Sequence, residues 1–292
     1  MSGTPHRVAG APVPDLLATI VAAARHSVDE RARRCPESEL AGQASAIRPR
    51  GAQFLAALAS DAGPNVIAEC KRRSPSKGVL RADYHPDRLA SSYEANGAAA
   101  ISVLTEPTFF DGSLDHLRLV RRAVDLPLLR KDFIVTSYQL VEAVAAGADA
   151  ILLIVAALED DELRRLHQEA TALGLAVLVE VHSQQELERA EAAEVAIVGV
   201  NNRDLRTLTV DLTASRTLIR QMASGVVGVA ESGLRTSADL VDLGQAGYRA
   251  FLIGETLMSA PDPGETLGRL IRETRDATQA RDASGWAVGE TP

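Results

Sequence analysis

Eight short apolar runs, separated by longer amphipathic stretches, limit the fold of this chain more than any other feature. The runs are VIAEC (66–70), AAISVL (99–104), LPLLRKD (126–132), AILLIV (150–155), AVLVEV (176–181), AIVGVN (196–201), VVGVAES (226–232) and RAFLIG (249–254). Strands that are apolar on both faces are typical of a parallel sheet covered by helices. Eight such strand-helix units predict an α/β fold of the (β/α)8 TIM barrel type.

The segments between the runs support this prediction. Residues 160–173 and 183–193 have apolar residues at helical spacing. Glycines stand where such helices would end, at Gly97, Gly147, Gly174 and Gly247. An open doubly wound sheet is the structural alternative, but its first turn usually has the pattern GxGxxG. The corresponding turn here is SPSKG, which favours the barrel.

The chain is expected to have three parts. Residues 1–65 are predicted to form an N-terminal extension whose amphipathic helices pack on a barrel of residues 66–275. The run at 16–24 has helical spacing and leads into charged residues, which favours a helix over a signal-peptide core. A second helix is expected around residues 53–58. Residues 276–292 are polar, small and charged, and predict a flexible C-terminal tail.

The composition argues against several classes of protein. The net charge is −8 and the isoelectric point is about 5.3, whereas a nucleic-acid-binding protein needs a concentrated basic face. No apolar run approaches the length of a membrane span. The two cysteines, Cys35 and Cys70, have no CxxC spacing, so neither a metal site nor a disulfide framework is expected. A cytoplasmic location is the simplest interpretation.

Polar residues gather at the C-terminal ends of the predicted strands, where barrels of this type carry their active sites. The two-residue period of a strand places Glu69 and Lys71 on the same side. Other strand ends carry Lys131, Glu180, Asn201, Arg203, Glu231 and Glu255. Any one of these residues alone is more often a solvated or salt-bridging side chain. Because the opposite strand ends carry few charges, the asymmetry predicts a polar catalytic mouth.

Two of the strand ends suggest an anion site. Ser232-Gly233 and Gly254 follow the last two strands, where barrels commonly bind phosphate through backbone N–H groups. These glycines can equally be turn residues. Ser74 and Lys77, in the first loop, would add a hydroxyl group and a cation. The combination favours a small phosphorylated substrate.

A set of long motifs resembles one enzyme family. IAECKRRSPSKG, ISVLTEPTFFDGSLDHL, LPLLRKDFIV, DAILLIVAAL, LVEVH, VGVNNRDL and VAESGL occur in this order. They resemble indole-3-glycerol phosphate synthase of tryptophan biosynthesis over about residues 14–262. Thr108, before the Phe pair, is a minor departure that changes no candidate catalytic group. The resemblance implies a carboxy-lyase that needs no cofactor. The protein partners with which it could associate are other enzymes of the same pathway.

The resemblance also implies the reaction. The family closes the ring of 1-(2-carboxyphenylamino)-1-deoxyribulose 5-phosphate and releases carbon dioxide and water, giving indole-3-glycerol phosphate. Lys131 matches the general acid that protonates the ketose oxygen during ring closure, and Glu180 matches the base that removes the ring proton. Lys71 matches the second lysine, which holds the carboxylate or acts as acid for dehydration. Glu69 and Asn201 match groups that orient the lysine and substrate hydroxyls.

The remaining predicted site residues bind substrate rather than transfer protons. The resemblance implies phosphate or substrate contacts for Ser74, Ser232, Gly233 and Gly254, and a place in the substrate pocket for Arg203 and Phe110. Three further residues at strand ends complete the predicted pocket, namely Glu231, Leu252 and Glu255.

Two alternative functions remain open from the sequence. A barrel similar to phosphoribosylanthranilate isomerase would use a cysteine at the first strand end, so Cys70 would have to point inward. A catalytically silent barrel that binds a phosphorylated metabolite would be expected to lack one of the ionisable groups at the mouth. Cys70 is instead predicted to pack against the helices, and His182 is predicted to be a satisfied or exposed residue before the helix N-cap Ser183.

Overall fold

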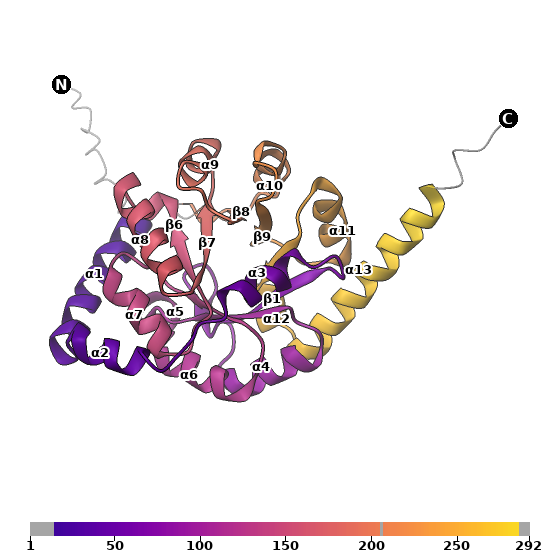
Figure 1. The fold of residues 1–292 in the computed structure, drawn as a ribbon. Coiled ribbons are helices and arrows are strands. Elements are labelled where there is room, and N and C mark those ends of the chain that lie inside the picture. The colour runs from indigo at the N-terminus through magenta and orange to yellow at the C-terminus, as the bar shows by residue number, and fades with distance from the viewer. Residues whose placement is uncertain (1–14, 205–206, 286–292) are drawn as a thin grey trace, which may run out of the picture.

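Eight parallel strands form a closed barrel in the computed structural model, which describes residues 15–204 and 207–285 (Figure 1). Around the barrel the strand order is β1-β10-β9-β8-β7-β6-β5-β4. The strands are β1 (Asn65–Cys70), β4 (Ala100–Leu104), β5 (Leu128–Lys131), β6 (Ala150–Ile154), β7 (Ala176–Val181), β8 (Ile197–Asn201), β9 (Val227–Glu231) and β10 (Ala250–Ile253). Each predicted run overlaps one strand, which confirms the predicted TIM barrel.

Helices follow the strands and cover the outside of the barrel (Figure 1). They are α4 (Pro86–Ala95), α6 (Leu114–Ala123), α7 (Ser137–Ala145), α8 (Asp160–Ala172), α9 (Gln184–Glu191), α10 (Thr213–Leu218), α11 (Ser237–Ala246) and α13 (Pro263–Gly285). The four predicted helix-ending glycines have φ between 84 and 121°, the left-handed region that a side chain disfavours. At Gly147 an added Cβ would also lie 2.7 Å from Cγ of Arg121.

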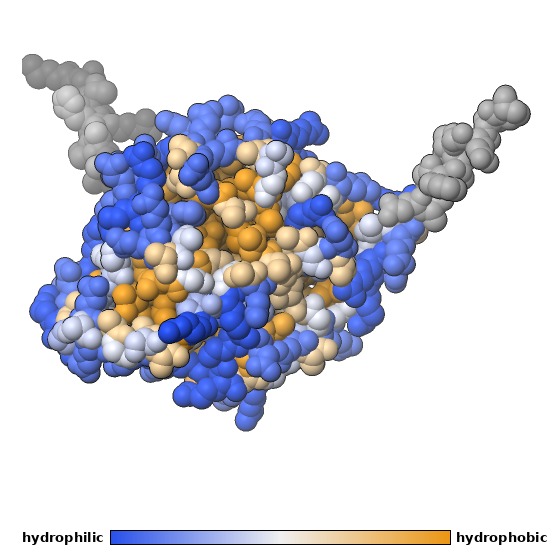
Figure 2. Space-filling view, viewed as in Figure 1, coloured by the Kyte–Doolittle hydropathy of each residue, from blue (hydrophilic) through white to orange (hydrophobic). Residues whose placement is uncertain are grey.

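The first loop and several strand ends carry short elements. They are β2 (Arg73–Ser74), β3 (Gly78–Val79), α5 (Pro107–Phe110), α12 (Glu255–Met258) and the 3-10 turns η1 (Val155–Ala157) and η2 (Ile219–Gln221). In the space-filling view, apolar residues gather near the centre of the visible face and hydrophilic residues surround them (Figure 2). Hydrophilic residues therefore predominate around the edge of this face.

Three helices precede the barrel, namely α1 (Leu16–Arg34), α2 (Glu37–Ala44) and α3 (Gly51–Ala59). Phe54 and Leu58 of α3 are fully buried with the first inward-facing residues of the strands, so α3 closes the N-terminal end of the barrel. Leu17 and Ile20 of α1 belong to the same interior cluster. The barrel interior is therefore a continuous apolar column to which the N-terminal helices contribute.

The C-terminal part departs from the sequence prediction. Helix α13 continues to Gly285, ten residues beyond the expected end of the barrel domain at residue 275. Ala, Gln and Arg in this segment favour a helix, and once the buried turns around Thr274 have formed, each further residue adds one hydrogen bond. Residues 276–285 of the predicted tail are therefore helical, and residues 286–292 lie outside the described residues. None of the described helices is both long and apolar enough to span a membrane.

Candidate active site

The predicted site residues all line one cavity at the C-terminal mouth of the barrel. These residues are Glu69, Lys71, Ser74, Phe110, Lys131, Glu180, Asn201, Arg203, Glu231, Ser232, Gly233, Leu252, Gly254 and Glu255. They come from seven strand ends and the loops that follow them. Residues that lie up to 186 positions apart in the chain (Glu69 to Glu255) therefore share one chamber.

Two lysines in the cavity are held by buried carboxylates. Nζ of Lys131 lies 3.3 Å from Oε2 of Glu180 and 3.6 Å from Oε2 of Glu231. Nζ of Lys71 lies 2.5 Å from Oε2 of Glu69. The lysine side chains retain about 15% exposure, whereas each carboxylate is at most 5% exposed. The ammonium groups therefore face the cavity from a layer of carboxylates beneath them.

Burial and charge act in opposite directions on the Lys131–Glu180 pair. Burial by itself would lower the pKa of Lys131, but the carboxylates of Glu180, Glu231 and Glu69 raise it above its usual value. Burial would raise the pKa of Glu180, but Lys131, His182 and a hydrogen bond from Asn201 lower it. The pair is therefore a charged acid and a charged base in contact, as proton transfer at a single substrate requires.

Glu231 differs from the other carboxylates. Burial raises its pKa to about 8, and the negative charges of Glu180 and Glu69 outweigh part of the opposing effect of Lys131. Its Oε1 atom makes no hydrogen bond to any described residue. Gly199 makes room for this side chain, because an added Cβ there would lie 2.1 Å from Oε1 of Glu231. Glu231 is therefore mainly a neutral carboxylic acid at pH 7.

Gly254 has a steric role next to the other ion pair. An ideal Cβ at this position would lie 1.9 Å from Oε2 of Glu69 and 3.0 Å from Nζ of Lys71. Its φ of −122° is ordinary, so space and not backbone conformation requires glycine here. The sequence suggested Gly254 as an anion contact. The structure adds that the absence of a side chain at Gly254 leaves the space that the Glu69–Lys71 pair occupies.

The opposite side of the cavity presents small residues and backbone groups. Ser232 and Gly233 have φ of 64° and 80°, a tight left-handed turn directly after β9. Ser74 is buried at 6% exposure in the β2–β3 hairpin and lines the same cavity. Such a turn exposes successive backbone N–H groups, which is the usual construction of an anion-binding site.

Arg203 and Glu255 are paired to each other at the rim. Nη2 of Arg203 donates to Oε2 of Glu255 at 2.9 Å, and Nη1 donates to the carbonyl of Leu208 at 3.1 Å. Nζ of Lys77 lies 3.9 Å from the other oxygen of Glu255. The carboxylate of Glu255 thus fixes two cations beside the Ser232–Gly233 turn.

The apolar wall of the cavity includes residues that the sequence analysis did not select. Leu16, Leu17 and Ile20 of α1 line it, together with aliphatic residues of the strands. Phe110 and Phe133 lie on the wall with ring centroids 6.2 Å apart. The helical spacing of Leu17 and Ile20 indicated a buried face but not which surface it covers. The structure brings that face over the mouth of the barrel.

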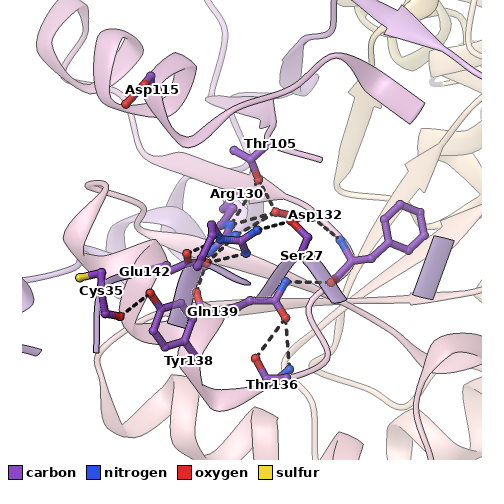
Figure 3. A network of polar contacts seen from close by, with 12 residues as sticks. Ser27, Cys35, Thr105, Asp115, Arg130, Asp132, Thr136, Tyr138, Gln139 and Glu142 are labelled. Atoms are coloured by element: carbon purple, nitrogen blue, oxygen red, sulfur yellow. Dashed lines mark hydrogen bonds and ion pairs between the residues drawn. The ribbon is translucent and has the colours of Figure 1, made fainter. Parts of the chain in front are cut away.

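Strand β5 carries a second polar network on its outer side (Figure 3). Arg130 is 1% exposed and donates to Asp132 at 2.8 Å, to the carbonyl of Gln139 at 2.7 Å and to Glu142 at 3.3 Å. Arg31 of α1 donates to the two oxygens of Glu142 at 2.6 and 3.0 Å. The network therefore ties β5, which carries Lys131, to helices α7 and α1.

The outcomes for two further residues bear on function. Cys70 is fully buried in the layer between the strands and the helices, as expected, and burial raises the pKa of its thiol. The Nδ1 atom of His182 lies 3.3 Å from Oε2 of Glu186, as expected of a satisfied residue. Its Nε2 also lies 3.5 Å from Oε1 of Glu180, a contact that the sequence did not indicate. Among the described residues, no group of three or more His, Cys, Asp or Glu residues is arranged to hold a metal ion.

Known proteins are similar in sequence to most of this chain. A sequence model of the family described as indole-3-glycerol phosphate synthase matches residues 17–270. The chain belongs to the indole-3-glycerol phosphate synthase family. The indole-3-glycerol phosphate synthase of Salinibacter ruber is 47% identical over 259 residues, which cover 88% of this chain and 96% of that protein. The enzyme of a Nocardioides strain is 56% identical over 209 residues, which cover 72% and 80%.

Solved structures of other enzymes share the fold at low identity. Tryptophan synthase subunit alpha from Legionella pneumophila has a TM-score of 0.56 and 16% identity, covering 80% of this chain and 99% of that one. Thiamine phosphate pyrophosphorylase from Pyrococcus furiosus has a TM-score of 0.56 and 16% identity, covering 73% and 96%. At this identity the likeness supports the barrel alone.

Proposed function

We propose that this chain converts 1-(2-carboxyphenylamino)-1-deoxyribulose 5-phosphate into indole-3-glycerol phosphate, carbon dioxide and water, as a step of tryptophan biosynthesis. The observation that carries this proposal is the contact of Lys131 with Glu180 at 3.3 Å, inside a cavity that also holds the Lys71–Glu69 pair. Ring closure, decarboxylation and dehydration need a proton donor, a cation for a carboxylate and a base. The cavity contains each of these groups.

In this proposal Lys131 is the general acid for ring closure. The aromatic carbon that bears the carboxylate attacks the ketose carbonyl, and Lys131 gives its proton to the carbonyl oxygen, which becomes a hydroxyl group. The carboxylate then leaves as carbon dioxide, and its bonding electrons return to the ring system. The carboxylate of Glu180 keeps the ammonium group charged, and Glu180 and Glu231 together hold it close to the carbonyl oxygen until the transfer.

The later steps use the other ion pair and Glu180. Lys71, held at 2.5 Å by Glu69, binds the carboxylate first and then protonates the departing hydroxyl group, which leaves as water. Glu180 removes the remaining ring proton, and this restores the aromatic indole. Asn201 donates a hydrogen bond to Glu180, which favours its ionised form and fixes its orientation.

The two ends of the substrate have chemically different places in the cavity. The phosphate group lies against the Ser232–Gly233 turn and the Ser74 hydroxyl group, with Arg203 beside them. The benzoate ring lies against Phe110, Leu252 and the α1 residues. Because the carboxylate of Glu255 would repel phosphate, its role in this proposal is to hold Arg203 rather than to contact substrate.

The alternative reaction of phosphoribosylanthranilate isomerase receives no support from Cys70. Its thiol is buried outside the cavity, and burial raises its pKa, so it offers no thiolate to a substrate. A silent barrel is disfavoured because Glu69, Lys71, Lys131 and Glu180 are all present at the mouth. A cytoplasmic location fits the two free cysteines of the chain. The proposal also includes association with other enzymes of the pathway.

The proposal is tested by mixing the purified protein with the carboxyphenylamino-deoxyribulose phosphate and recording indole fluorescence. The wild-type protein should form product, and Lys131→Met should lower kcat by about a thousandfold or more because ring closure loses its proton donor. Lys71→Met should retain single-turnover ring closure but slow a later step. Folded wild-type protein that forms no indole product would refute the proposal, and near-normal closure by Lys131→Met would refute the role of that lysine.

A further inference from the structure

One side chain that does not contact substrate, His182, lies next to Glu180, the proposed base. His182 follows Glu180 by two residues, at the point where β7 (Ala176–Val181) ends and before α9 begins. The pleat of the strand places both side chains on the inner side, whereas Val181 between them packs in the outer layer. Unlike the predicted site residues, His182 does not line the cavity.

Glu186 of α9 holds His182 in a defined orientation. One carboxylate oxygen of Glu186 accepts a hydrogen bond from the backbone N–H of His182 at 2.7 Å and lies 3.3 Å from Nδ1 of its ring. The carboxylate can accept but not donate at neutral pH, so Nδ1 carries a proton. Because the ring is fixed by Nδ1, Nε2 faces Oε1 of Glu180 at 3.5 Å.

This orientation favours a positively charged ring. In the neutral form with the proton on Nδ1, the lone pair of Nε2 would face the carboxylate of Glu180 and repel it. Nε2 is buried and makes no hydrogen bond to any described residue, so no other group there compensates for this repulsion. A proton on Nε2 turns the repulsion into an attraction. In agreement, although burial would lower the pKa of His182, Glu186, Glu180 and Glu231 raise it.

The surroundings of Glu180 show what such a cation would contribute. From β5, Lys131 contacts Oε2 of Glu180 at 3.3 Å; from β8, Asn201 donates a hydrogen bond. From β9 the carboxyl group of Glu231 faces the same ammonium, and Glu69 of β1 adds its charge from across the barrel. In the proposed reaction Lys131 gives up its proton first. From that moment His182 is the cation that still neighbours the base.

We infer that His182 is a positioning residue for Glu180: clamped by Glu186, it holds Oε1 of the base and keeps the carboxylate ionised after Lys131 has donated its proton. The inference rests on the proposed function, in which Glu180 removes the ring proton. It assigns His182 no contact with substrate, because the ring lies behind Glu180 and outside the cavity wall.

The test is the pH profile of kcat in wild-type protein, His182→Ala and His182→Gln. Loss of the cation should move the acidic limb of kcat upward by about one pH unit in both variants. At neutral pH kcat should fall about three- to tenfold in His182→Ala, with KM within about twofold. His182→Gln should recover part of the neutral-pH kcat, since an amide can still donate to Oε1, but not the position of the acidic limb.

A matched control separates this role from a structural one. Ser183→Ala removes the N-cap of the same helix, since the Ser183 hydroxyl group accepts from the backbone N–H of Glu186 at 3.2 Å. This variant should lose thermal stability while its pH profile stays that of the wild type. If His182→Ala also lost only stability and kept the wild-type acidic limb, the inference would be overturned.

A measurement without turnover distinguishes this inference from the proposed function. The titration of Glu180 can be followed by carbon-13 NMR of glutamate carboxyl groups in the full-length protein without substrate. The signal of Glu180 is assigned by its absence in Glu180→Gln. In His182→Ala the pKa of Glu180 should be about one unit higher than in the wild-type protein. An unchanged Glu180 titration contradicts the role of His182 whatever the enzyme does. A wild-type protein that forms no indole, with the shift observed, contradicts the function alone.

Discussion

The buried carboxyl group of Glu231 should make the stability of this protein depend on pH in an unusual direction. Its pKa is raised from 4.5 to about 8 in the folded protein. The folded state therefore binds one more proton than the unfolded state between these values. The contribution of Glu231 to stability is complete below pH 4.5 and is lost as the pH rises through about 8.

The size of the effect follows from the shift. One pKa unit corresponds to about 1.4 kcal/mol, so the change between about pH 5.5 and about pH 8.5 amounts to about 3 kcal/mol. Because other groups also titrate in this range, the measured quantity is the difference in free energy of unfolding between wild-type protein and Glu231→Gln. The glutamine side chain has nearly the same shape and cannot ionise. Relative to the variant, the wild-type protein should lose about 3 kcal/mol across this range.

Urea unfolding followed by circular dichroism at the two pH values measures this difference. Repeating the comparison in a Lys131→Met background provides the control. Lys131 lowers the pKa of Glu231, so without it the loss of stability should continue to a higher pH. If the difference between wild-type protein and Glu231→Gln changed by less than about 0.5 kcal/mol, Glu231 would not be the neutral acid described above.

Two further substitutions test the packing around the site. Gly254→Ala places a methyl group 1.9 Å from the present position of Oε2 of Glu69, so it should displace that carboxylate and lower kcat/KM at least about tenfold in the indole assay, with little loss of secondary structure. Glu142→Gln leaves the charges of Arg130 and Arg31 without their shared carboxylate, and urea unfolding should show a loss of about 3 kcal/mol. Unchanged kinetics in the first case, or unchanged stability in the second, would contradict these contacts.

The fold was accessible from the sequence because it follows from a periodic pattern, whereas the roles proposed for Lys131 and Glu180 came from the resemblance of the motifs to one enzyme family. The period of two puts Glu69 and Lys71 on one side of the strand and Cys70 on the other. The structure shows that Glu69 and Lys71 line the cavity and that Cys70 packs in the outer layer. The sequence contained no signal for which pairs would touch, since the contact of Lys131 with Glu180 depends on how the strands close into a barrel.

The residues that the sequence analysis missed depend on tertiary placement. Leu16, Leu17 and Ile20 have the spacing of any buried helix face, and only the packing of α1 brings them into the cavity. His182 looked like an ordinary residue before a helix. Its relation to Glu180 requires the orientation that Glu186 imposes one turn later, and a local pattern cannot specify a side-chain torsion. The end of α13 was misplaced because polar, small residues are compatible with both a helix and a tail.

The charges of the site also explain why its carboxylates do not repel an anionic substrate. Lys71, Lys131 and His182 face Glu69, Glu180 and Glu231. Glu186, which contacts His182, adds a fourth carboxylate, so the net charge would be −1 if all seven groups were ionised. The raised pKa of Glu231 favours its neutral form and brings this sum to zero. A neutral Glu231 thus removes a negative charge beside Lys131 that would repel the carboxylate of the substrate.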